Sequence, residues 1–571
     1  MQNILGRETF SLNGRWSIMP DLTDQGLKKS WGQPQKLNYE RLVEISFEGG
    51  QTLHVPGDWN SQYPEFAYFE DIMWYKRTFH YKKEKDRRYF LHFAAVSSHA
   101  IVFMNGVRLG EHIGNYTPFQ FEITDIIKEG DNNVIVRVDN IRGDDMIPGK
   151  NFDWWNYGGI TRGVDIVSTP NTYISDYWLR LERGSMDRLL VDVQLDGVNK
   201  ANQNVVVKLN GTKIKRSIET DNNGKGEIAI KADLELWSPK SPKLYDVELI
   251  TDQELITDQI GFRSFECRGT EILLNGEPIF MKGVNLHEEI GTDRRRSIGE
   301  QDAEYLVQHL LELGCNHVRL THYPADEYIL RKCEERGLMV WEEIPIRGGD
   351  IDFTNKVMMD GARVMMEEMI TRDKNRCGVV MWSVSNETHS HGENRNEFLI
   401  SLIDRCREMD DTRAITFASN QVKISMEGET TIKRLDDPLA DYVDIIGVNN
   451  YQGWYMPWSG DASNTKWIIR DNKPIVMSEF GAGCVYGKYG SATDPQSWSE
   501  DYMVTAYENY LKSFEGVANL RGTMPWVMFD FRSIRRSHAT NQQGWNRKGL
   551  LSPEGEKKQA WYIMHEYYKN K

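Results

Sequence analysis

The first half of the chain alternates apolar and polar residues in short runs. Up to about residue 265, runs such as YFLHF, NNVIVRVDN, RLLVDVQLDG and KLYDVELIT carry an apolar residue at nearly every second position, which is typical of half-buried β-strands. The pairs Asn105-Gly106 and Asn210-Gly211 each lie between two runs and predict tight hairpin turns with positive φ at both central residues. A break at STPNT, residues 168–172, separates a larger from a smaller unit. We therefore predict two β-sandwiches, over residues 1–170 and 171–265.

From about residue 283 the pattern changes to short apolar runs separated by helix-like stretches such as QDAEYLVQHLLELG and NEFLISLIDRCREMD. The apolar runs are GVNLH, HVRLTHYP, LMVWEEIP, VVMWSVSNE, AITFAS, DIIGVNNY, PIVMSEFG and TMPWVMFDF. Strands and helices that alternate in this way indicate a (β/α)8 or TIM barrel, which we expect over residues 266–571. Catalytic groups of such barrels lie at the carboxyl ends of the strands. The runs place there His287, His322, Glu342, Glu343, Asn386, Glu387, Tyr451, Glu479 and Asp530.

Two of these residues form the strongest candidate pair: Glu387 ends the fourth run and Glu479 ends the seventh. Strands three apart in an eight-stranded barrel face each other across its mouth. Glycoside cleavage with retention needs two carboxyl groups about 5 to 5.5 Å apart, one to attack the anomeric carbon and one to protonate the departing oxygen. The alternative is that each glutamate caps a helix or pairs with an arginine. Because Asn386 and Ser478 precede them at the ends of apolar strands, we favour catalysis.

Composition and charge exclude several other classes of protein. The net charge of −15, with Lys and Arg scattered along the chain, argues against nucleic acid as a partner, and no apolar run is long enough to span a membrane. The six cysteines contain no Cys-x-x-Cys pair, so neither a disulfide framework nor a zinc knuckle is expected. His389 and His391 are too few ligands for a metal site. The first residues carry no secretory signal, so we expect a cytoplasmic protein, or a periplasmic one if a signal has been trimmed; homo-oligomerisation stays open.

The chain resembles glycoside hydrolase family 2, which contains β-galactosidases, β-glucuronidases and β-mannosidases. The similarity covers nearly the whole length. Residues 105–119, NGVRLGEHIGNYTPF, resemble the amino-terminal jelly roll of the family, and residues 315–342, CNHVRLTHYPADEYILRKCEERGLMVWE, resemble its barrel signature. The resemblance implies a jelly roll, an immunoglobulin-like sandwich and a TIM barrel in that order. It also implies an enzyme that uses water and needs no cofactor.

The resemblance assigns roles to residues at the strand ends. It implies that Glu387 is the acid/base and that Asn386 beside it grips the sugar 2-hydroxyl. The segment SEFG implies that Glu479 is the nucleophile. Tyr451 and His322 are implied to contact the sugar. Trp526, which belongs to the eighth run, is implied to form the floor of the pocket, since family members place a tryptophan there.

Within the family the chain is most similar to the β-glucuronidase branch. Asn546-Arg547-Lys548 resembles the N-x-K carboxylate clamp of those enzymes, and a lysine ammonium near the sugar C5 substituent is what a glucuronate carboxylate requires. The segment NNYQGWY, residues 449–455, resembles their strand-six loop and implies that Tyr455 binds substrate. Asp153, in NFDWWNYGGITR, resembles the aspartate that their jelly roll extends into the active site, where it would bind a ring hydroxyl.

Alternatives stay open at this point. Similar Asn-x-Lys-Gly segments occur in relatives that cleave galactosides, and Gln542 stands where β-glucuronidases tend to have arginine, so a β-galactosidase or β-galacturonidase on the same scaffold is the alternative. A salt bridge at the last strand is the other role open to Lys548. No long insertion follows the third run, WEEIPIRGGDIDFTN, which implies an open pocket. A non-catalytic carbohydrate-binding protein is the remaining alternative. The sequence argues against it, because both carboxylates and Asn386 are present, whereas we expect a protein that only binds to have lost at least one of them.

Six further side chains near the expected mouth have less specific roles. Aromatic residues stack on sugar rings, but they also fill interfaces between domains, and the sequence does not decide between these roles for Trp154, Trp155 and Tyr157. Acidic residues near the mouth can bind a cation or a hydroxyl, but we expect them to orient Arg or His side chains, and they are Glu288, Glu342 and Glu343.

Overall fold

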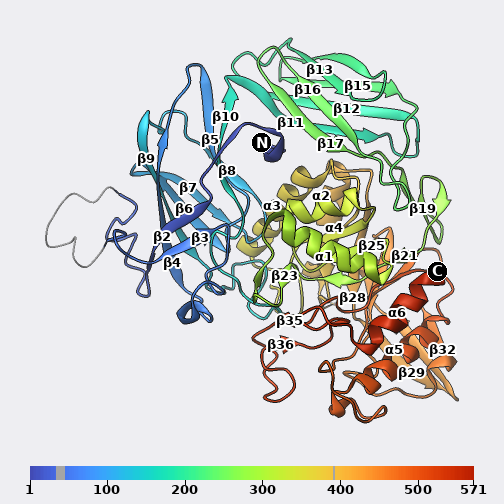
Figure 1. Cartoon of the computed structure of the whole chain (residues 1–571). Coiled ribbons are helices and arrows are strands. Elements are labelled where there is room, and N and C mark those ends of the chain that lie inside the picture. The colour runs from blue at the N-terminus through green and yellow to red at the C-terminus, as the bar shows by residue number, and fades with distance from the viewer. Residues whose placement is uncertain (34–45, 390–391) are drawn as a thin grey trace.

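The computed structural model describes residues 1–33, 46–389 and 392–571 (Figure 1). Two β-domains and a barrel with outer helices follow one another along the chain, and all three pack together, with the N-terminal segment lying between them (Figure 1). The predicted fold class, two β-sandwiches followed by a TIM barrel, is confirmed.

The N-terminal domain consists of two antiparallel sheets, with the strand orders β3-β2-β4-β9-β6-β7 and β1-β10-β5-β8. Apolar side chains from both sheets form one cluster, which includes Trp16, Trp59, Tyr75 and Leu91. The strands are β1 (Thr9–Ser11), β2 (Gly14–Pro20), β3 (Thr52–Val55), β4 (Ile72–Tyr81), β5 (Arg87–Phe93), β6 (His99–Met104), β7 (Val107–Ile113), β8 (Phe119–Glu122), β9 (Gly130–Asp139) and β10 (Val164–Pro170).

The second domain pairs a three-stranded sheet, β11-β12-β15, with a four-stranded sheet, β14-β13-β16-β17. Its strands alternate buried and more exposed residues, as strands with one face on a core do. They are β11 (Thr172–Leu181), β12 (Arg188–Gly197), β13 (Asn204–Leu209), β14 (Lys215–Glu219), β15 (Lys225–Lys231), β16 (Tyr245–Ile250) and β17 (Leu255–Ile260). A small sheet then leads into the barrel: β18 (Phe265–Arg268), β19 (Glu271–Leu274) and β20 (Glu277–Pro278).

The barrel is a closed parallel sheet with the order β21-β34-β33-β31-β28-β27-β26-β25-β22. It closes because β21 and β22 are two pieces of its first strand, of which β21 pairs with β34 and β22 pairs with β25. The strands are β21 (Met281–Lys282), β22 (Asn285–Leu286), β25 (His317–Leu320), β26 (Met339–Glu343), β27 (Val379–Asn386), β28 (Ala414–Ser419), β31 (Ile445–Asn449), β33 (Ile475–Glu479) and β34 (Leu520–Thr523).

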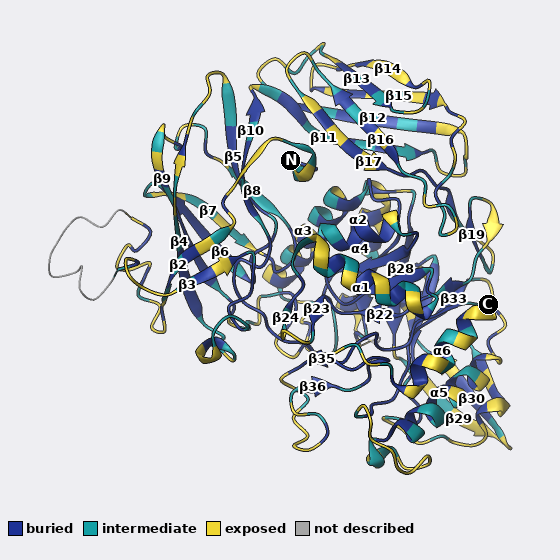
Figure 2. Cartoon of the chain, viewed as in Figure 1, coloured by how far each residue is buried: buried dark blue, intermediate teal, exposed yellow. Residues whose placement is uncertain are grey.

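Barrel strands are buried on both faces, because helices cover the outside and side chains fill the inside. All eight residues of β27 are buried, whereas β12 alternates; Figure 2 shows the same contrast between the barrel and the two sandwiches. The helices are α1 (Gly299–Leu313), α2 (Glu327–Glu335), α3 (Lys356–Asp373), α4 (Glu393–Met409), α5 (Glu500–Phe514) and α6 (Gln559–Lys569).

Strand–helix alternation is not complete. In the chain between β28 and β33, a small sheet of β29 (Val422–Glu427), β30 (Thr430–Leu435) and β32 (Thr465–Ile468) stands in place of α-helices. Short pairs of strands, β23 (Glu289–Ile290) with β24 (Arg295–Arg296) and β35 (Phe531–Arg532) with β36 (Trp545–Asn546), shape the loops after the first and last barrel strands.

Two local expectations were wrong. The eighth strand is Leu520–Thr523, so most of the run TMPWVMFDF lies in the loop beyond it, with Trp526 and Asp530.

A hairpin with positive φ at both central residues forms at Asn105-Gly106, where φ is 51° and 84°. At Asn210-Gly211 only the glycine has positive φ, at 77°. There the connection is longer, because β13 ends at Leu209 and β14 begins at Lys215.

All six cysteines are unpaired in the structure, and five of them are buried. Among the described residues, no helix is both long and apolar enough to cross a membrane.

Candidate active site

The two candidate carboxylates lie at the same end of the barrel. Glu479 is the last residue of β33, and Glu387 directly follows β27, with a positive φ of 54°. Asn449, the last residue of β31 between them, connects the two strand ends. Its amide nitrogen donates to Glu387 Oε1 at 2.9 Å, and its amide oxygen accepts from Ser478 Oγ at 2.7 Å. The barrel therefore places both carboxylates around one mouth, as their positions in the sequence predicted.

Glu479 is 4% exposed and accepts hydrogen bonds on both oxygens. Arg319 Nη1 donates to Oε1 at 2.8 Å, and the Tyr451 hydroxyl donates to Oε2 at 2.7 Å. Burial raises the pKa of this carboxyl to about 7; the guanidinium of Arg319 opposes the rise, and the neighbouring charge of Glu387 adds to it. Two donors aimed at one carboxylate hold it in a fixed orientation, as an attacking group requires.

Arg319, on β25, is a functional residue that sequence reasoning missed. Its side chain is fully buried and donates to Glu343 at 3.0 and 3.1 Å and to Asn386 Oδ1 at 2.9 Å, besides Glu479. Arg319 therefore neutralises the buried carboxylates of Glu343 and Glu479. It also orients Asn386, the residue before Glu387. The only signal in the sequence was a charged residue inside the apolar run HVRL.

His322 and Trp526 form a flat wall beside these groups. Their rings stack with centroids 5.0 Å apart and planes 13° apart. His322 Nδ1 lies 2.6 Å from Glu343 Oε1, so Glu343 orients an Arg and a His, as expected. Burial and the charge of Arg319 lower the pKa of His322, which keeps the ring neutral. A flat aromatic surface of this kind packs against the C–H face of a sugar.

Lys548 and Tyr455 lie together beside Tyr451, whose ring centroid is 5.4 Å from that of Tyr455. Lys548 is 2% exposed, and its Nζ donates to the Tyr455 hydroxyl at 2.9 Å. The guanidinium of Arg536 reaches the same hydroxyl at 3.3 Å. Desolvation of the hydroxyl opposes ionisation of Tyr455, although the residue as a whole is 56% exposed, but Lys548 and Arg536 lower the pKa of this hydroxyl. In the part of the chain that the structure describes, Lys548 has no carboxylate partner, so the salt bridge that was the alternative role of Lys548 does not form there.

Asp153 comes from the N-terminal domain and meets the loop that follows the eighth strand. Its carboxylate pairs with Arg536, accepts from Ser533 Oγ at 2.6 Å, and lies 3.4 Å from the Asn546 amide nitrogen. Although burial would raise it, Arg536 lowers the pKa of Asp153 to about 2. Arg536 thus links Asp153 to Tyr455. The sequence did not single it out, because nothing in SIRRS indicates which arginine of the loop turns inward.

Several other candidates do not belong to the pocket. Asp530 forms a fully buried ion pair with Lys558 at 2.7 Å. Glu342 pairs with Arg372, and Glu288 pairs with two arginines, Arg162 and Arg296, which confirms the orienting role expected of the mouth glutamates.

The aromatic loop and the two histidines also have other places. Both tryptophans lie at the interface between domains: Trp154 packs on Tyr323 of the barrel and Trp155 on the guanidinium of Arg532. Trp154 also lies beside the His322 ring, with centroids 5.7 Å apart, so it borders the site from the N-terminal domain. His389 is exposed, and His391 lies outside the described residues. Within residues 1–33, 46–389 and 392–571, no group of three or more His, Cys, Asp or Glu side chains is arranged to hold a metal ion.

The raised pKa of Glu479 predicts the pH dependence of the reaction. An attacking carboxyl must be ionised, so kcat/KM should fall below the pKa of Glu479 in the free enzyme, about 7, by about tenfold per pH unit. We expect a profile of kcat/KM measured from pH 4 to 8 to have its acidic limb near pH 7. A limb near 4.5, the ordinary value for a glutamate, would contradict this environment of Glu479.

Comparison with known proteins points to one family in all three domains. Models described as glycosyl hydrolases family 2 match residues 10–170 (sugar binding domain), 172–263 and 265–570 (TIM barrel domain). Human β-glucuronidase is 27% identical over 624 positions, which cover 98% of this chain and 91% of the relative. A putative β-glucuronidase of Formosa agariphila is 25% identical and covers 96% and 70%.

Solved structures share the fold over the whole chain. A β-glucuronidase from an uncultured Clostridium species superposes with a TM-score of 0.84 at 25% identity and covers 100% of this chain and 99% of its own. A β-galacturonidase from Eisenbergiella tayi, bound to galacturonate, superposes with a TM-score of 0.82 at 24% identity and covers 99% and 98%.

Proposed function

Because the chain belongs to family 2 of the glycosyl hydrolases, it is a glycoside hydrolase, and we propose that its substrate is a terminal β-linked uronide, in the first place a β-glucuronide. The reaction is a double displacement with retention. Glu479 attacks the anomeric carbon while Glu387 gives a proton to the departing oxygen. Glu387 then takes a proton from water, which attacks the glycosyl-enzyme and releases Glu479.

The surroundings of the two carboxylates suit these two roles. Glu479 is fixed by a cation and a phenol, so the carboxylate that attacks is already oriented. Glu387 is half-buried and accepts one neutral hydrogen bond, from Asn449, so it is accessible both to a leaving group and to water. Asn386, which Arg319 orients, lies beside it to bind the sugar 2-hydroxyl.

The observation that supports a uronide substrate is that two cationic side chains, Lys548 and Arg536, meet at the Tyr455 hydroxyl. A buried ammonium without a carboxylate partner is costly to keep charged, and burial lowers the pKa of Lys548. A substrate carboxylate at this position would supply the missing countercharge and accept charge-assisted hydrogen bonds from Lys548 and Arg536. A hydroxymethyl group would gain little from two cations. Relatives named β-glucuronidase support the same substrate.

A β-galacturonide is the second candidate, because a galacturonate-binding relative shares the fold and the two sugars differ only in the configuration at C4. Gln542 in place of arginine does not decide between them, since Arg536 supplies a guanidinium from the same loop. Parallel assays with nitrophenyl β-glucuronide, β-galacturonide and β-galactoside separate the three specificities. Faster cleavage of the galactoside than of both uronides would overturn the proposal.

Lys548→Ala tests the carboxylate clamp. We expect kcat/KM on nitrophenyl β-glucuronide to fall at least about 30-fold, because losing one partner of a buried charge pair costs about 2–5 kcal/mol. On a neutral nitrophenyl glycoside, kcat/KM should change by less than about threefold, because no charge pair is lost there. The neutral substrate is the control within the same variant, and thermal unfolding checks that the fold is intact. Equal losses on both substrates would contradict the proposed role of Lys548 in binding the substrate carboxylate.

A further inference from the structure

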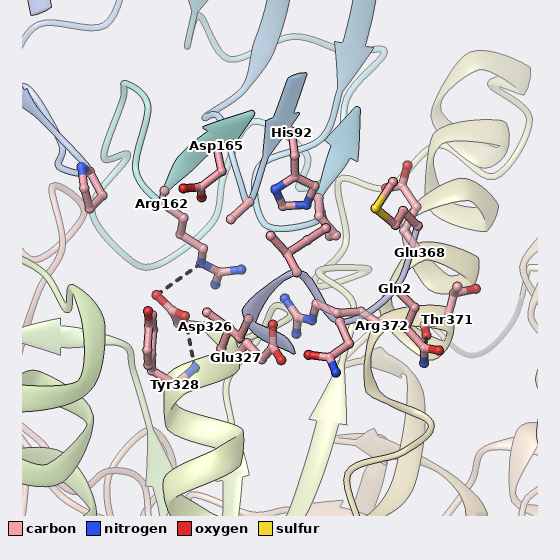
Figure 3. A pocket seen from close by; sticks show the side chains of 18 of the residues that line it. Gln2, His92, Arg162, Asp165, Asp326, Glu327, Tyr328, Glu368, Thr371 and Arg372 are labelled. Carbon is pink, nitrogen blue, oxygen red and sulfur yellow. Dashed lines mark hydrogen bonds and ion pairs between the residues drawn. The ribbon is translucent and has the colours of Figure 1, made fainter. Parts of the chain in front are cut away.

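A second cavity lies where the N-terminal domain meets helices α2 and α3 (Figure 3). Its volume of about 680 Å³ lies within the range of ligand-binding cavities, roughly 300–1,000 Å³. Strands β5 and β10, residues 1–5 and the two helices all contribute to its lining. None of the residues assigned to catalysis or to sugar binding above lines it.

Two polar side chains of the N-terminal domain point into this cavity. His92 on β5 and Asp165 on β10 are directly paired in register, so their side chains stand next to each other on one face of the sheet; Figure 3 shows both directed into the cavity. His92 is only 6% exposed, and its Nδ1 has no hydrogen-bond partner among the residues that the structure describes. Burial lowers the pKa of His92 to about 3 and raises that of Asp165. A buried polar atom without a partner is rare in folded proteins.

Arg162, three residues before Asp165 in the same segment, offers a further polar group beside it (Figure 3). Arg162 is 3% exposed and uses both terminal nitrogens, for the Tyr116 carbonyl, Glu288 and the Pro324 carbonyl. Its Nε is buried and, within the described ranges of the chain, has no hydrogen-bond partner; it lies 3.9 Å from Asp326 Oδ2. The cavity is therefore lined by three groups that can form hydrogen bonds with a ligand. His92 can donate or accept, the carboxylate of Asp165 accepts, and Arg162 donates.

The charges around the cavity favour an uncharged ligand. The carboxylates of its helices already have partners: Glu327 pairs with Arg331, Glu367 with Arg405, and Glu368 with His112. An anion would lie beside Asp165 and these carboxylates. Of the cationic groups in the lining, Arg162 and Arg372 already pair with Glu288 and Asp373, and burial lowers the pKa of the Met1 amino group. Within the described residues no cluster suited to a metal ion is present here. Pro56, Pro118 and Ile298 add apolar surface to the lining.

We propose that this cavity is a second carbohydrate site, which binds a neutral sugar of one or two rings. Hydroxyl groups both donate and accept hydrogen bonds, so they can satisfy His92, Asp165 and Arg162 together, while C–H faces of the ring lie on the apolar lining. The site is independent of the uronide specificity, because it shares no residue with the carboxylate clamp.

The experiment uses the full chain with the Glu479→Gln substitution, so that no sugar is cleaved. Calorimetry and saturation-transfer NMR measure binding of cellobiose, lactose and methyl β-D-glucopyranoside, with glucuronate and spermidine as charged probes. The cavity is blocked by Val364→Trp, an exposed position of α3 that lines it. The matched control is Val357→Trp on the same helix, which is exposed but outside the lining. Asp165→Asn tests the polar contact without adding bulk.

We expect at least one neutral sugar to bind. Its Kd should rise about tenfold or more in both Val364→Trp and Asp165→Asn, equivalent to about 1.4 kcal/mol or more, and stay unchanged in Val357→Trp. Three results would overturn the proposal: no binding of any neutral sugar, equal binding in the blocked variant, which would place the sugar elsewhere, or binding of spermidine or glucuronate, tighter than that of the neutral sugars, that is lost in Val364→Trp. Glucuronate bound at the carboxylate clamp would keep its affinity in that variant, because no residue of the clamp lines the cavity. Loss of the uronide specificity would leave this result unaffected.

Discussion

Glu479→Gln is expected to lower kcat/KM on an aryl β-glycoside by at least about 10⁴-fold, because removal of a residue that forms the covalent intermediate leaves only binding and electrostatic contributions to rate. Glutamine has nearly the shape of glutamate and can still accept from Tyr451, so the pocket should keep its form. It cannot attack the anomeric carbon, and it leaves the guanidinium of Arg319 with one carboxylate partner fewer.

Steady-state hydrolysis of nitrophenyl glycosides gives the size of the loss, and intact mass spectrometry shows whether a glycosyl-enzyme forms. Glu408→Gln, at an exposed glutamate of α4, is the matched control and should keep full activity. A wild-type protein that hydrolyses no aryl β-glycoside would favour the alternative of a carbohydrate-binding protein without catalysis. Residual activity above about one tenth in Glu479→Gln would remove this residue from the role of nucleophile, given how much covalent catalysis contributes.

The sequence predicted the carboxylate pair because both residues end continuous apolar runs. A run that is apolar on both faces belongs to a parallel strand covered by helices, and the end of such a strand in a barrel is where catalytic groups lie. Glu387 and Glu479 needed only this local pattern and the order of strands. The same is true of Asn386 and Tyr451, which lie within two residues of the ends of β27 and β31.

The contacts made by long loops could not be predicted in this way. Arg536 reaches Asp153 and Tyr455 from a loop whose path depends on the packing of the N-terminal domain against the barrel. Trp526 was placed at the end of a strand that in fact stops at Thr523. Hydrophobic periodicity describes the elements, whereas the position of a side chain on a loop depends on which partners lie opposite it.

Glu387→Ala is expected to separate the two steps of the reaction. With a poor leaving group, such as an alkyl alcohol, loss of the acid should slow formation of the glycosyl-enzyme by about 10²–10⁴-fold. A dinitrophenolate needs no proton to depart, so its release should be nearly as fast as in the wild-type enzyme. The second step then becomes slow, because no base activates water, and the glycosyl-enzyme on Glu479 should accumulate. A burst of dinitrophenol followed by slow turnover is the measurement.

Azide distinguishes the roles of the two carboxylates by the product that each alanine variant forms. In Glu387→Ala, azide needs no base and should attack the glycosyl-enzyme, which restores turnover and gives a glycosyl azide with the β configuration of the substrate. In Glu479→Ala, azide takes the place of the missing nucleophile and attacks the substrate directly, so the azide product should have the α configuration. Proton NMR identifies the anomer in each case. Products exchanged between the two variants would reverse the assignment of nucleophile and acid/base, and α products from both would mean that no glycosyl-enzyme forms, contrary to a retaining mechanism.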